Sequence, residues 1–219
     1  MTAKGDYFPV GPNMFVPNCK YAADCSLEGK LFVNLTPNAP IASAANTILA
    51  ATSIAVAGST STFLIPFTEA QMGKFGRNLI VNASGAATSN VTIQGYDYLG
   101  QPMAESFTLA GAASVVGQKA FRRVTLVTFG ATAATTINVG VGVSLGLPYA
   151  NQGDMVDYTN EVRSGSQGTS TLRVATQTLT SGDPRGLFTP SSAPDGNRKY
   201  SLTYEPYRNA LYGAAHVVS

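Results

Sequence analysis

The amino-acid sequence predicts an all-β protein whose core is a β-sandwich or barrel, jelly-roll-like in type. Six short runs of alternating or β-branched residues follow one another, and each is bounded by Gly, Asn or Ser. Strands at such regular spacing are typical of sandwiches and barrels. The chain has 219 residues, of which 44% are hydrophobic, so it can bury a substantial core without disulfides. The six predicted strands cover residues 60–67, 78–83, 90–97, 103–109, 121–129 and 135–143.

The first forty residues predict an extended N-terminal arm. Prolines stand at positions 9, 12, 17, 37 and 40, and few apolar residues recur with a period. An arm without a core of its own is ordered mainly by lying on its own domain or on a neighbour. In the segment that follows, residues 42–49 are compatible with one or two helical turns, whereas alternation over 53–57 favours a strand.

Two of the predicted strands form a hairpin whose register can be proposed. A three-residue loop over 99–101 pairs Ile93 with Phe107 and Val91 with Leu109, so that the apolar residues share one face.

The predicted strand 121–129 has apolar residues in both phases. Val124 and Leu126 lie in one phase and Val127 and Phe129 in the other, which favours a central strand covered on both faces.

The last seventy residues predict a second β region. Strands over 170–178 and 199–204 flank a long loop, 181–197, rich in Pro, Gly and Ser, and together they form a long-looped C-terminal hairpin. Loops of this length are usually functional or ordered by a partner. The predicted organisation is an arm over 1–40, a main β domain over 41–150, and a C-terminal β region over 151–219 that can belong to the same domain.

The composition predicts a protein that works against other protein surfaces. Charged residues are 12% of the chain, against roughly 25% in an average soluble domain, so the surface is unusually neutral. Free soluble proteins usually keep charge dispersed over their exteriors, so we expect lasting burial against partners. The net charge of +2 and the lack of any basic run argue against nucleic acid. No stretch has the length of a membrane span and the N-terminus lacks a secretory pattern, so we expect no membrane association and synthesis in the cytosol.

Residues that carry chemistry are scarce. His216, the single histidine, stands three residues before the end, and Cys19 and Cys25 complete the set of nitrogen and sulfur metal ligands. The cysteine spacing matches neither a redox pair nor a zinc framework, which leaves reduced thiols or one small disulfide loop. The glycines between 140 and 146 fail the dinucleotide-binding spacing and favour a strand-edge role. We therefore expect no catalytic, cofactor-binding or metal-binding residues, and no enzyme.

One pair of carboxylates allows an alternative. The proposed register places Asp97 and Glu105 as diagonal neighbours at about 7–8 Å, a separation that a glycosidase can use. Structural pairing with Lys119, Arg122 or Arg123 is the favoured interpretation, because the chain contains no Trp of the kind that sugar-processing sites use.

Three segments occur in a suggestive order along the chain. They are 91–109 with 119–127, then 138–149 with its string Leu-Gly-Leu-Pro-Tyr, and then 182–190 leading into 200–204. Together they resemble the capsid decoration, or cement, proteins of tailed bacteriophages and related minor head proteins. The resemblance implies a subunit on the virion exterior, made in the host cytoplasm. It also implies that the subunit binds the major coat protein, bridges coat subunits and does not touch the DNA. A dimer or trimer would suit capsid symmetry axes.

The candidate interface residues lie in the arm and in the 181–197 loop, because aromatic and Arg side chains dominate interface energies. For Phe8, Phe15 and Phe32, packing on the chain's own sheet is an equal alternative. For Arg185 the alternative is a loop-closing bond to Asp183 or a carbonyl. The candidates are Tyr7, Phe8, Phe15, Phe32, Arg185 and Phe188.

Two other functions stay open. A tail, neck or head-fibre component shares neutral composition and β architecture. A carbohydrate- or receptor-binding module would use Tyr96, Tyr98 and the carboxylates of the same hairpin.

Overall fold

The computed structural model describes antiparallel strands and one four-residue helix, α1 (Glu69–Met72). The prediction of an all-β protein is confirmed, and the strands form sheets of five, six and four strands. The strand order does not establish a jelly roll. The described residues are 14–15, 31–36, 38–54, 60–66, 69–84, 88–131, 135–159, 162–166, 171–173 and 182–206.

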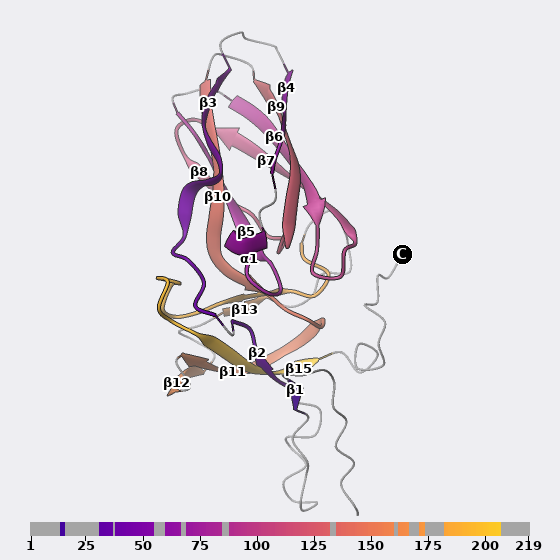
Figure 1. Ribbon diagram of the computed structural model, residues 1–219, viewed down its shortest axis with the longest axis vertical. Helices are drawn as coiled ribbons and strands as arrows, with labels where there is room; N and C mark the ends of the chain where they lie inside the picture. The colour runs from indigo at the N-terminus through magenta and orange to yellow at the C-terminus, as the bar shows by residue number, and fades with distance from the viewer. Residues whose placement is uncertain are drawn as a thin grey trace, which may run out of the picture.

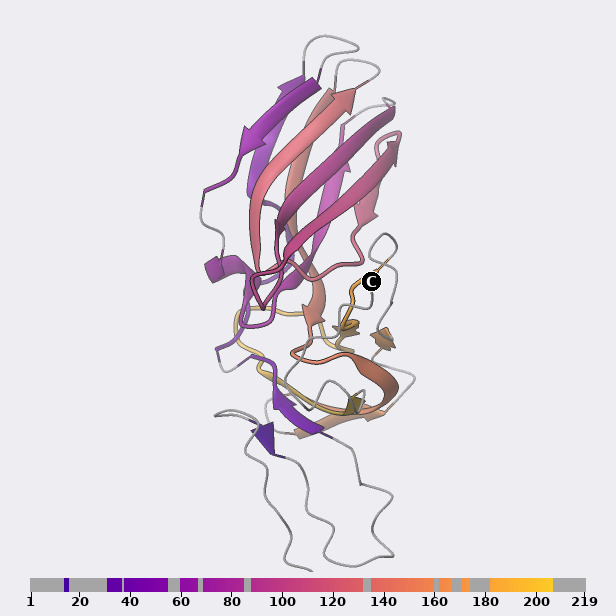
Figure 2. The same cartoon turned by 90° about the vertical axis from the view of Figure 1, so that its right-hand side faces the viewer.

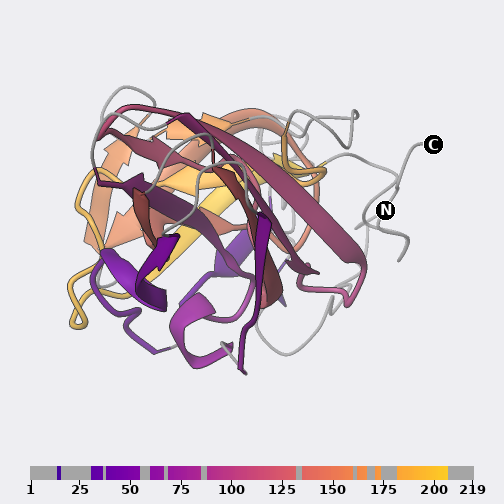
Figure 3. The same cartoon turned by 90° about the horizontal axis from the view of Figure 1, so that it is seen from above.

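Two of the sheets form a sandwich, which is the upper half of the molecule in Figure 1. The four-stranded sheet has the order β4-β9-β6-β7 and is seen from its outer side in Figure 2. Seen from above, the strands curve around the core like half a barrel (Figure 3). The four strands are β4 (Thr60–Leu64), β9 (Arg123–Ala131), β6 (Thr88–Tyr96) and β7 (Pro102–Ala110).

The opposing six-stranded sheet is organised around one long strand, β10 (Thr135–Gly146). β10 pairs with β5 along one side, and with β3 and then β14 along the other. Its remaining strands are β3 (Ala44–Ile54), β5 (Arg77–Ala83), β8 (Ser114–Val116), β13 (Thr171–Arg173) and β14 (Leu187–Thr189). The whole of 44–54 is therefore a strand, and the helical alternative for 42–49 is wrong.

The sandwich encloses the first core of the protein. Alternation along each strand directs one set of apolar side chains inward, as the sequence pattern predicts. Val91 and Ile93 of β6 and Phe107 and Leu109 of β7 are buried there, at 2% exposure or less. They pack against residues of the six-stranded sheet, which include Leu79, Val81, Ile137, Val139 and Val141.

The β6–β7 hairpin differs from the sequence prediction in its register. Val91 pairs with Phe107 rather than with Leu109. The loop keeps the predicted three residues but occupies 98–100 in place of 99–101. Because the shift is two residues along the partner strand, every side chain stays on its predicted face.

Asp97 sets the position of this loop. Its Oδ1 accepts hydrogen bonds from the amides of Leu99 and Gln101, both at 2.8 Å, and its own amide donates to the Gln101 carbonyl. Gly100, at φ 79°, takes the left-handed conformation that closes such a loop. The predicted register rested on a three-residue loop placed at 99–101 and on apolar alternation, and neither contains information about these polar bonds.

Strand β9 is central, between β4 and β6, but it is not covered on both faces as predicted. Thr125 is an extra residue, because Val124 and Leu126 oppose adjacent residues of β6. The resulting β-bulge switches the phase of the strand. Val124 is therefore buried on the same side as Val127 and Phe129, and Leu126 is only partly buried.

The lower half of the molecule is a five-stranded sheet that packs on a second core. Its order is β1-β2-β15-β11-β12 (Figure 1). The second core contains Leu202 and Tyr204 of β15, Leu145 at the end of β10, and Phe188 of β14. The strands are β1 (Met14–Phe15), β2 (Leu31–Asn34), β11 (Asn151–Thr159), β12 (Val162–Ser166) and β15 (Tyr200–Pro206).

The predicted C-terminal hairpin is wrong. β13 pairs with β14, whereas β15 pairs with β2 and β11, so the two proposed partner strands lie in different sheets. Over 182–197 the predicted loop contains β14, whose Leu187 and Phe188 are buried. The last part of the predicted arm, 31–34, is likewise a strand of the lower sheet. Most of 1–30 lies outside the described residues.

The glycines of β10 allow neighbouring backbone and side-chain atoms to approach the strand closely in the interior of the sheet. The prediction had given these glycines a role at a strand edge. A Cβ on Gly140 would stand 1.7 Å from the Ala44 carbonyl oxygen, and one on Gly142 would stand 2.3 Å from the Asn78 side chain. Asn78 needs that space, because its Nδ2 donates to Gly117 and its Oδ1 accepts from the Ser144 amide.

Candidate functional site

A buried ion pair lies where the two halves of the molecule meet. Arg185 Nη1 donates to Asp97 Oδ2 at 2.7 Å, and both side chains are 4% exposed. Arg185 Nε and Nη2 are buried with no hydrogen-bond partner among the described residues. The pair thus holds a charged guanidinium inside the protein through one strong contact.

The turn that carries Arg185 is held by polar bonds. Asp183 Oδ1 accepts from the Arg185 amide at 2.9 Å, and Asp183 Oδ2 accepts from the Ala120 amide at 2.8 Å. Asn151 Nδ2 donates to the Arg185 carbonyl at 3.0 Å. Burial raises the pKa of Asp183 above its ordinary value. The charge of Arg185 and the hydrogen bonds from the Ala120 and Arg185 backbone amides oppose that rise. The predicted long loop is therefore anchored within the protein.

A second carboxylate, that of Glu105, is partly buried on the neighbouring strand β7. Glu105 Oε1 accepts from the Gln118 amide at 2.5 Å, and its Oε2 is buried without a hydrogen-bond partner. Burial raises the pKa of Glu105 to about 7, and the Gln118 amide and Lys119 oppose the rise. Lys119 Nζ donates to the Ala104 carbonyl at 2.8 Å, and burial lowers the pKa of Lys119.

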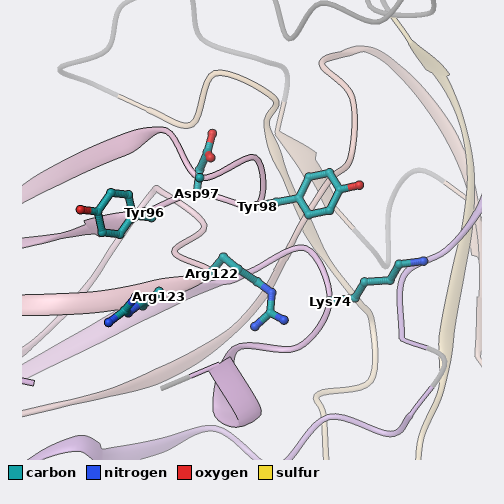
Figure 4. Close-up of a pocket in the computed structure, with 7 residues that line it drawn as sticks. Lys74, Tyr96, Asp97, Tyr98, Arg122 and Arg123 are labelled. Atoms are coloured by element: carbon teal, nitrogen blue, oxygen red, sulfur yellow. The ribbon is translucent and has the colours of Figure 1, made fainter. Parts of the chain in front are cut away.

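A pocket of about 540 Å³ opens beside the tip of the β6–β7 hairpin. Its lining comes from three segments: the loop after α1, the hairpin tip and the chain that enters β9 (Figure 4). Tyr98 is held edge-on against Phe75, with ring centroids 4.8 Å apart, and Tyr96 is 39% exposed. The lining residues are Lys74, Tyr96, Asp97, Tyr98, Gly100, Arg122 and Arg123.

The lining of this pocket contains three bases and one acid, and each of these four residues already has an interaction partner in the protein. In Figure 4 the Asp97 carboxylate is turned away from Arg122 and Arg123. Lys74 Nζ lies 5.0 Å above the Phe75 ring.

The structure separates the six candidate interface residues into three groups. Tyr7 and Phe8, and the side chain of Phe15, lie outside the described residues. Phe32 of β2 is partly exposed. Arg185 and Phe188 are 4% and 0% exposed, respectively, because they pack within the protein itself, so neither offers an exposed anchor in this conformation. The Arg185 amide bonds to Asp183, as the alternative expected, while its guanidinium pairs with Asp97.

The two carboxylates of the glycosidase alternative do not form a pair. Asp97 closes the hairpin loop opposite Gln101, and Glu105 lies further along β7 opposite Ile93. Each has a structural partner, Arg185 for Asp97 and the Gln118 amide for Glu105. Of the expected partners only Lys119 lies near enough to affect the pKa of Glu105.

The part of the chain that the structure describes contains no group of three or more His, Cys, Asp or Glu side chains placed to hold a metal ion. No helix in that part of the chain has the length and apolar character to cross a membrane.

Three edge strands of the upper sandwich contain no charged residue. β3, β4 and β8 each pair with a single neighbour among the described residues. Their sequences, AANTILAATSI, TSTFL and SVV, lack Lys, Arg, Asp, Glu and Pro. Leu64 on β4 is 85% exposed and Val116 on β8 is 54% exposed. Soluble proteins usually protect such edges with charge or Pro, so these edges are suited to docking.

Sequence reasoning did not find this pocket. Lys74 is far from Arg122 and Arg123 in the sequence. No run of basic residues therefore indicates that the three line one pocket. The adjacent pair Arg122 and Arg123 at the start of a predicted strand was the one available indication. Comparisons of the chain with family models, with curated proteins and with solved structures find no match.

Proposed function

We propose that this protein is a non-catalytic structural subunit of a bacteriophage virion, a decoration protein that binds the outer surface of the coat lattice and bridges coat subunits. The observation that carries the proposal is the set of uncharged sheet edges, β3, β4 and β8. A free protein with such edges is exposed to strand pairing with other chains, whereas a permanently docked one is not.

The composition and the sequence resemblance support the same function. Charged residues make up 12% of the chain, which suits a surface that stays covered. The ionic groups Asp97 and Arg185 are buried in a structural contact with each other. The segments that resemble phage cement proteins include the β6–β7 hairpin and β14.

The mechanism is additive contact with the coat. Each apolar side chain that becomes buried at a coat junction contributes roughly 1.5–3 kcal/mol. Leu64 and Val116 are the exposed apolar side chains on the uncharged edges. Symmetry repeats the gain over many copies, so modest contacts stabilise the head against internal pressure.

The test is a phage particle that lacks the protein. We expect heads to assemble without it and to release DNA at a lower temperature or after milder osmotic shock, and purified protein added back to restore resistance. Unchanged DNA release, or density confined to the tail in cryo-electron microscopy of the complete particle, would overturn the decoration role.

A further inference from the structure

We propose that β4 (Thr60–Leu64) pairs with β4 of a second copy of this chain, antiparallel and with Thr62 beside the twofold axis. The pairing joins the four-stranded sheets of the two copies into one continuous sheet. The inference goes beyond the proposed function, because the partner of this edge is a second copy and not the coat. The uncharged edges β3 and β8 remain for the coat.

β4 is a free edge of the four-stranded sheet. It pairs with β9 and, among the described residues, with no other strand, and Figure 2 shows it as the outermost strand of that sheet. The Ile65 amide donates to the Thr125 carbonyl of β9 at 2.9 Å, and backbone groups alternate in direction along a strand. Every second residue before Ile65 therefore bonds to β9, and the residues between them point their amides and carbonyls outward. The outward residues are Thr60, Thr62 and Leu64.

The outward residues are complementary to their own copies. When Thr62 lies opposite Thr62 of the second copy, Thr60 lies opposite Leu64 of that copy. Every outward backbone group then meets a partner, because such opposite residues exchange both of their hydrogen bonds. The side chains also keep their faces, since the period along a strand is two. Leu64, which is 85% exposed, comes to lie against the methyl group of Thr60.

The inward face of β4 supports the same register. Phe63 is partly buried and packs on the first core, where its ring centroid lies 5.2 Å from that of Phe129. In the paired edges the two copies of Phe63 are diagonal neighbours at about 7–8 Å, a separation that aromatic side chains can bridge. The first cores of the two copies therefore meet at the axis, and apolar surface on both faces of β4 becomes covered.

The two edges of the four-stranded sheet differ in charge. β4 has no charged residue, and its partner residues on β9, 126–130, are also uncharged, so no like charges meet across the axis. β7, the other edge strand, begins with Pro102 and has Glu105 on its inward face, opposite Ile93. Pro and inward-pointing charge are devices that prevent edge-to-edge pairing, and β4 has neither.

The other uncharged edges are less suited to self-pairing. β3 changes register along β10 between 137 and 139 and again between 139 and 141, so its free backbone groups do not form a regular row. β8 has three residues and offers few hydrogen bonds. The five residues of β4 still make a small interface, so we expect a dimer that dissociates on dilution.

Sedimentation velocity of the full-length protein, at several concentrations and without phage, measures self-association. We expect dimers at tens of micromolar and monomers after dilution. Thr62→Lys should weaken the dimer at least about tenfold, because the two added charges face each other across the axis. Thr108→Lys is the matched control, since it places the same charge on an exposed residue of the same sheet face but on β7, and it should dimerise like the wild type. Circular dichroism checks that both variants fold.

Thr62→Cys tests the register. In a hydrogen-bonded antiparallel pair the Cα atoms are about 5.5 Å apart, a separation that a disulfide can span. Mild oxidation should therefore convert the Thr62→Cys variant to a covalent dimer on a non-reducing gel. Thr108→Cys under the same conditions shows the background, which includes any reaction of Cys19 and Cys25. The cross-linking result decides the inference if Thr62→Lys does not fold.

Four results would overturn the inference: monomers at every concentration, a trimer in place of a dimer, equal dimerisation by Thr62→Lys and the wild type, or equal cross-linking of Thr62→Cys and Thr108→Cys. Failure of the proposed function is seen separately, in cosedimentation with purified phage heads. Protein that dimerises through β4 and does not bind heads would overturn only the decoration role. Monomeric protein that binds heads would overturn only the dimer.

Discussion

The Asp97 carboxylate and the Arg185 guanidinium join the tip of the β6–β7 hairpin to the turn that precedes β14. The two residues are 88 positions apart in the chain and both are 4% exposed. Asp97 follows a strand of the upper sandwich, and Arg185 precedes Phe188 of the second core. The pair therefore connects the two halves of the molecule at the edge of the pocket lined by Lys74, Arg122 and Arg123.

Asp97→Asn tests this connection. The amide oxygen can still accept from Leu99 and Gln101, so the loop is kept while Arg185 loses its counter-charge. Because the guanidinium would remain buried and unpaired, we expect a loss of about 3–5 kcal/mol in the free energy of unfolding, measured by urea denaturation.

Asp195→Asn is the matched control for that substitution. Asp195 also accepts two amide bonds through Oδ1 and pairs with Arg198 through Oδ2, but its ion pair is exposed to solvent. We expect its urea midpoint to stay within the scatter of the measurement, because exposed pairs contribute little. Equal losses in the two variants would contradict a special role for burial.

The stability of the protein should depend on pH through Glu105. Burial raises its folded-state pKa to about 7 from an ordinary value of 4.5, so the folded state binds the proton more tightly than the unfolded state. The stability that Glu105 contributes is then fully present below about pH 4.5 and is lost as the pH rises through 7. Asp183, whose pKa is also raised, adds a change of the same sign.

Glu105→Gln removes the Glu105 part of this dependence. A neutral amide cannot ionise, so the variant should gain about 1–3 kcal/mol relative to the wild type on going from pH 5 to pH 8. Urea denaturation at several pH values measures the difference. The same slope of stability against pH in both proteins would show that Glu105 does not titrate in this range.

Gly140→Ala tests the close approach of β3 and β10. The new methyl group would stand 1.7 Å from the Ala44 carbonyl oxygen, which belongs to the backbone and cannot rotate away. We expect a loss of about 1–3 kcal/mol or more, measured by thermal unfolding. Gly130→Ala on β9 is the control, because a methyl group there would meet no atom within 4 Å and the melting temperature should hardly change.

Leu64→Lys and Val116→Lys test the proposed docking edges. Both side chains are exposed, at 85% and 54%, so a charge there should leave folding intact and weaken binding to phage heads at least about tenfold for each edge used. Ala193→Lys places the same charge in an exposed loop and should bind like the wild type. Cosedimentation with heads measures the effect, and undiminished binding by both edge variants would exclude these edges.

The sequence by itself determined six strands of the upper sandwich, β4, β5, β6, β7, β9 and β10, and the inward face of the β6–β7 hairpin. The alternation in β6 and β7 correctly predicted one buried face for Val91, Ile93, Phe107 and Leu109. The predicted register of the two strands nevertheless differs from the observed one by two residues. This part of the fold is local, since the period of two acts over a few neighbouring residues and tolerates such a shift.

Only the tertiary structure decided which strands pair and where the charges meet. Four features depend on contacts between distant parts of the chain. They are the bulge at Thr125, the pairing of β15 with β2, the Asp97–Arg185 ion pair, and the pocket that Lys74 and Arg122 line together. Such contacts form when burial and polar bonds offset the entropy cost of closing a long loop. Both partner segments contribute to this balance of free energies, so neither segment by itself predicts the contact.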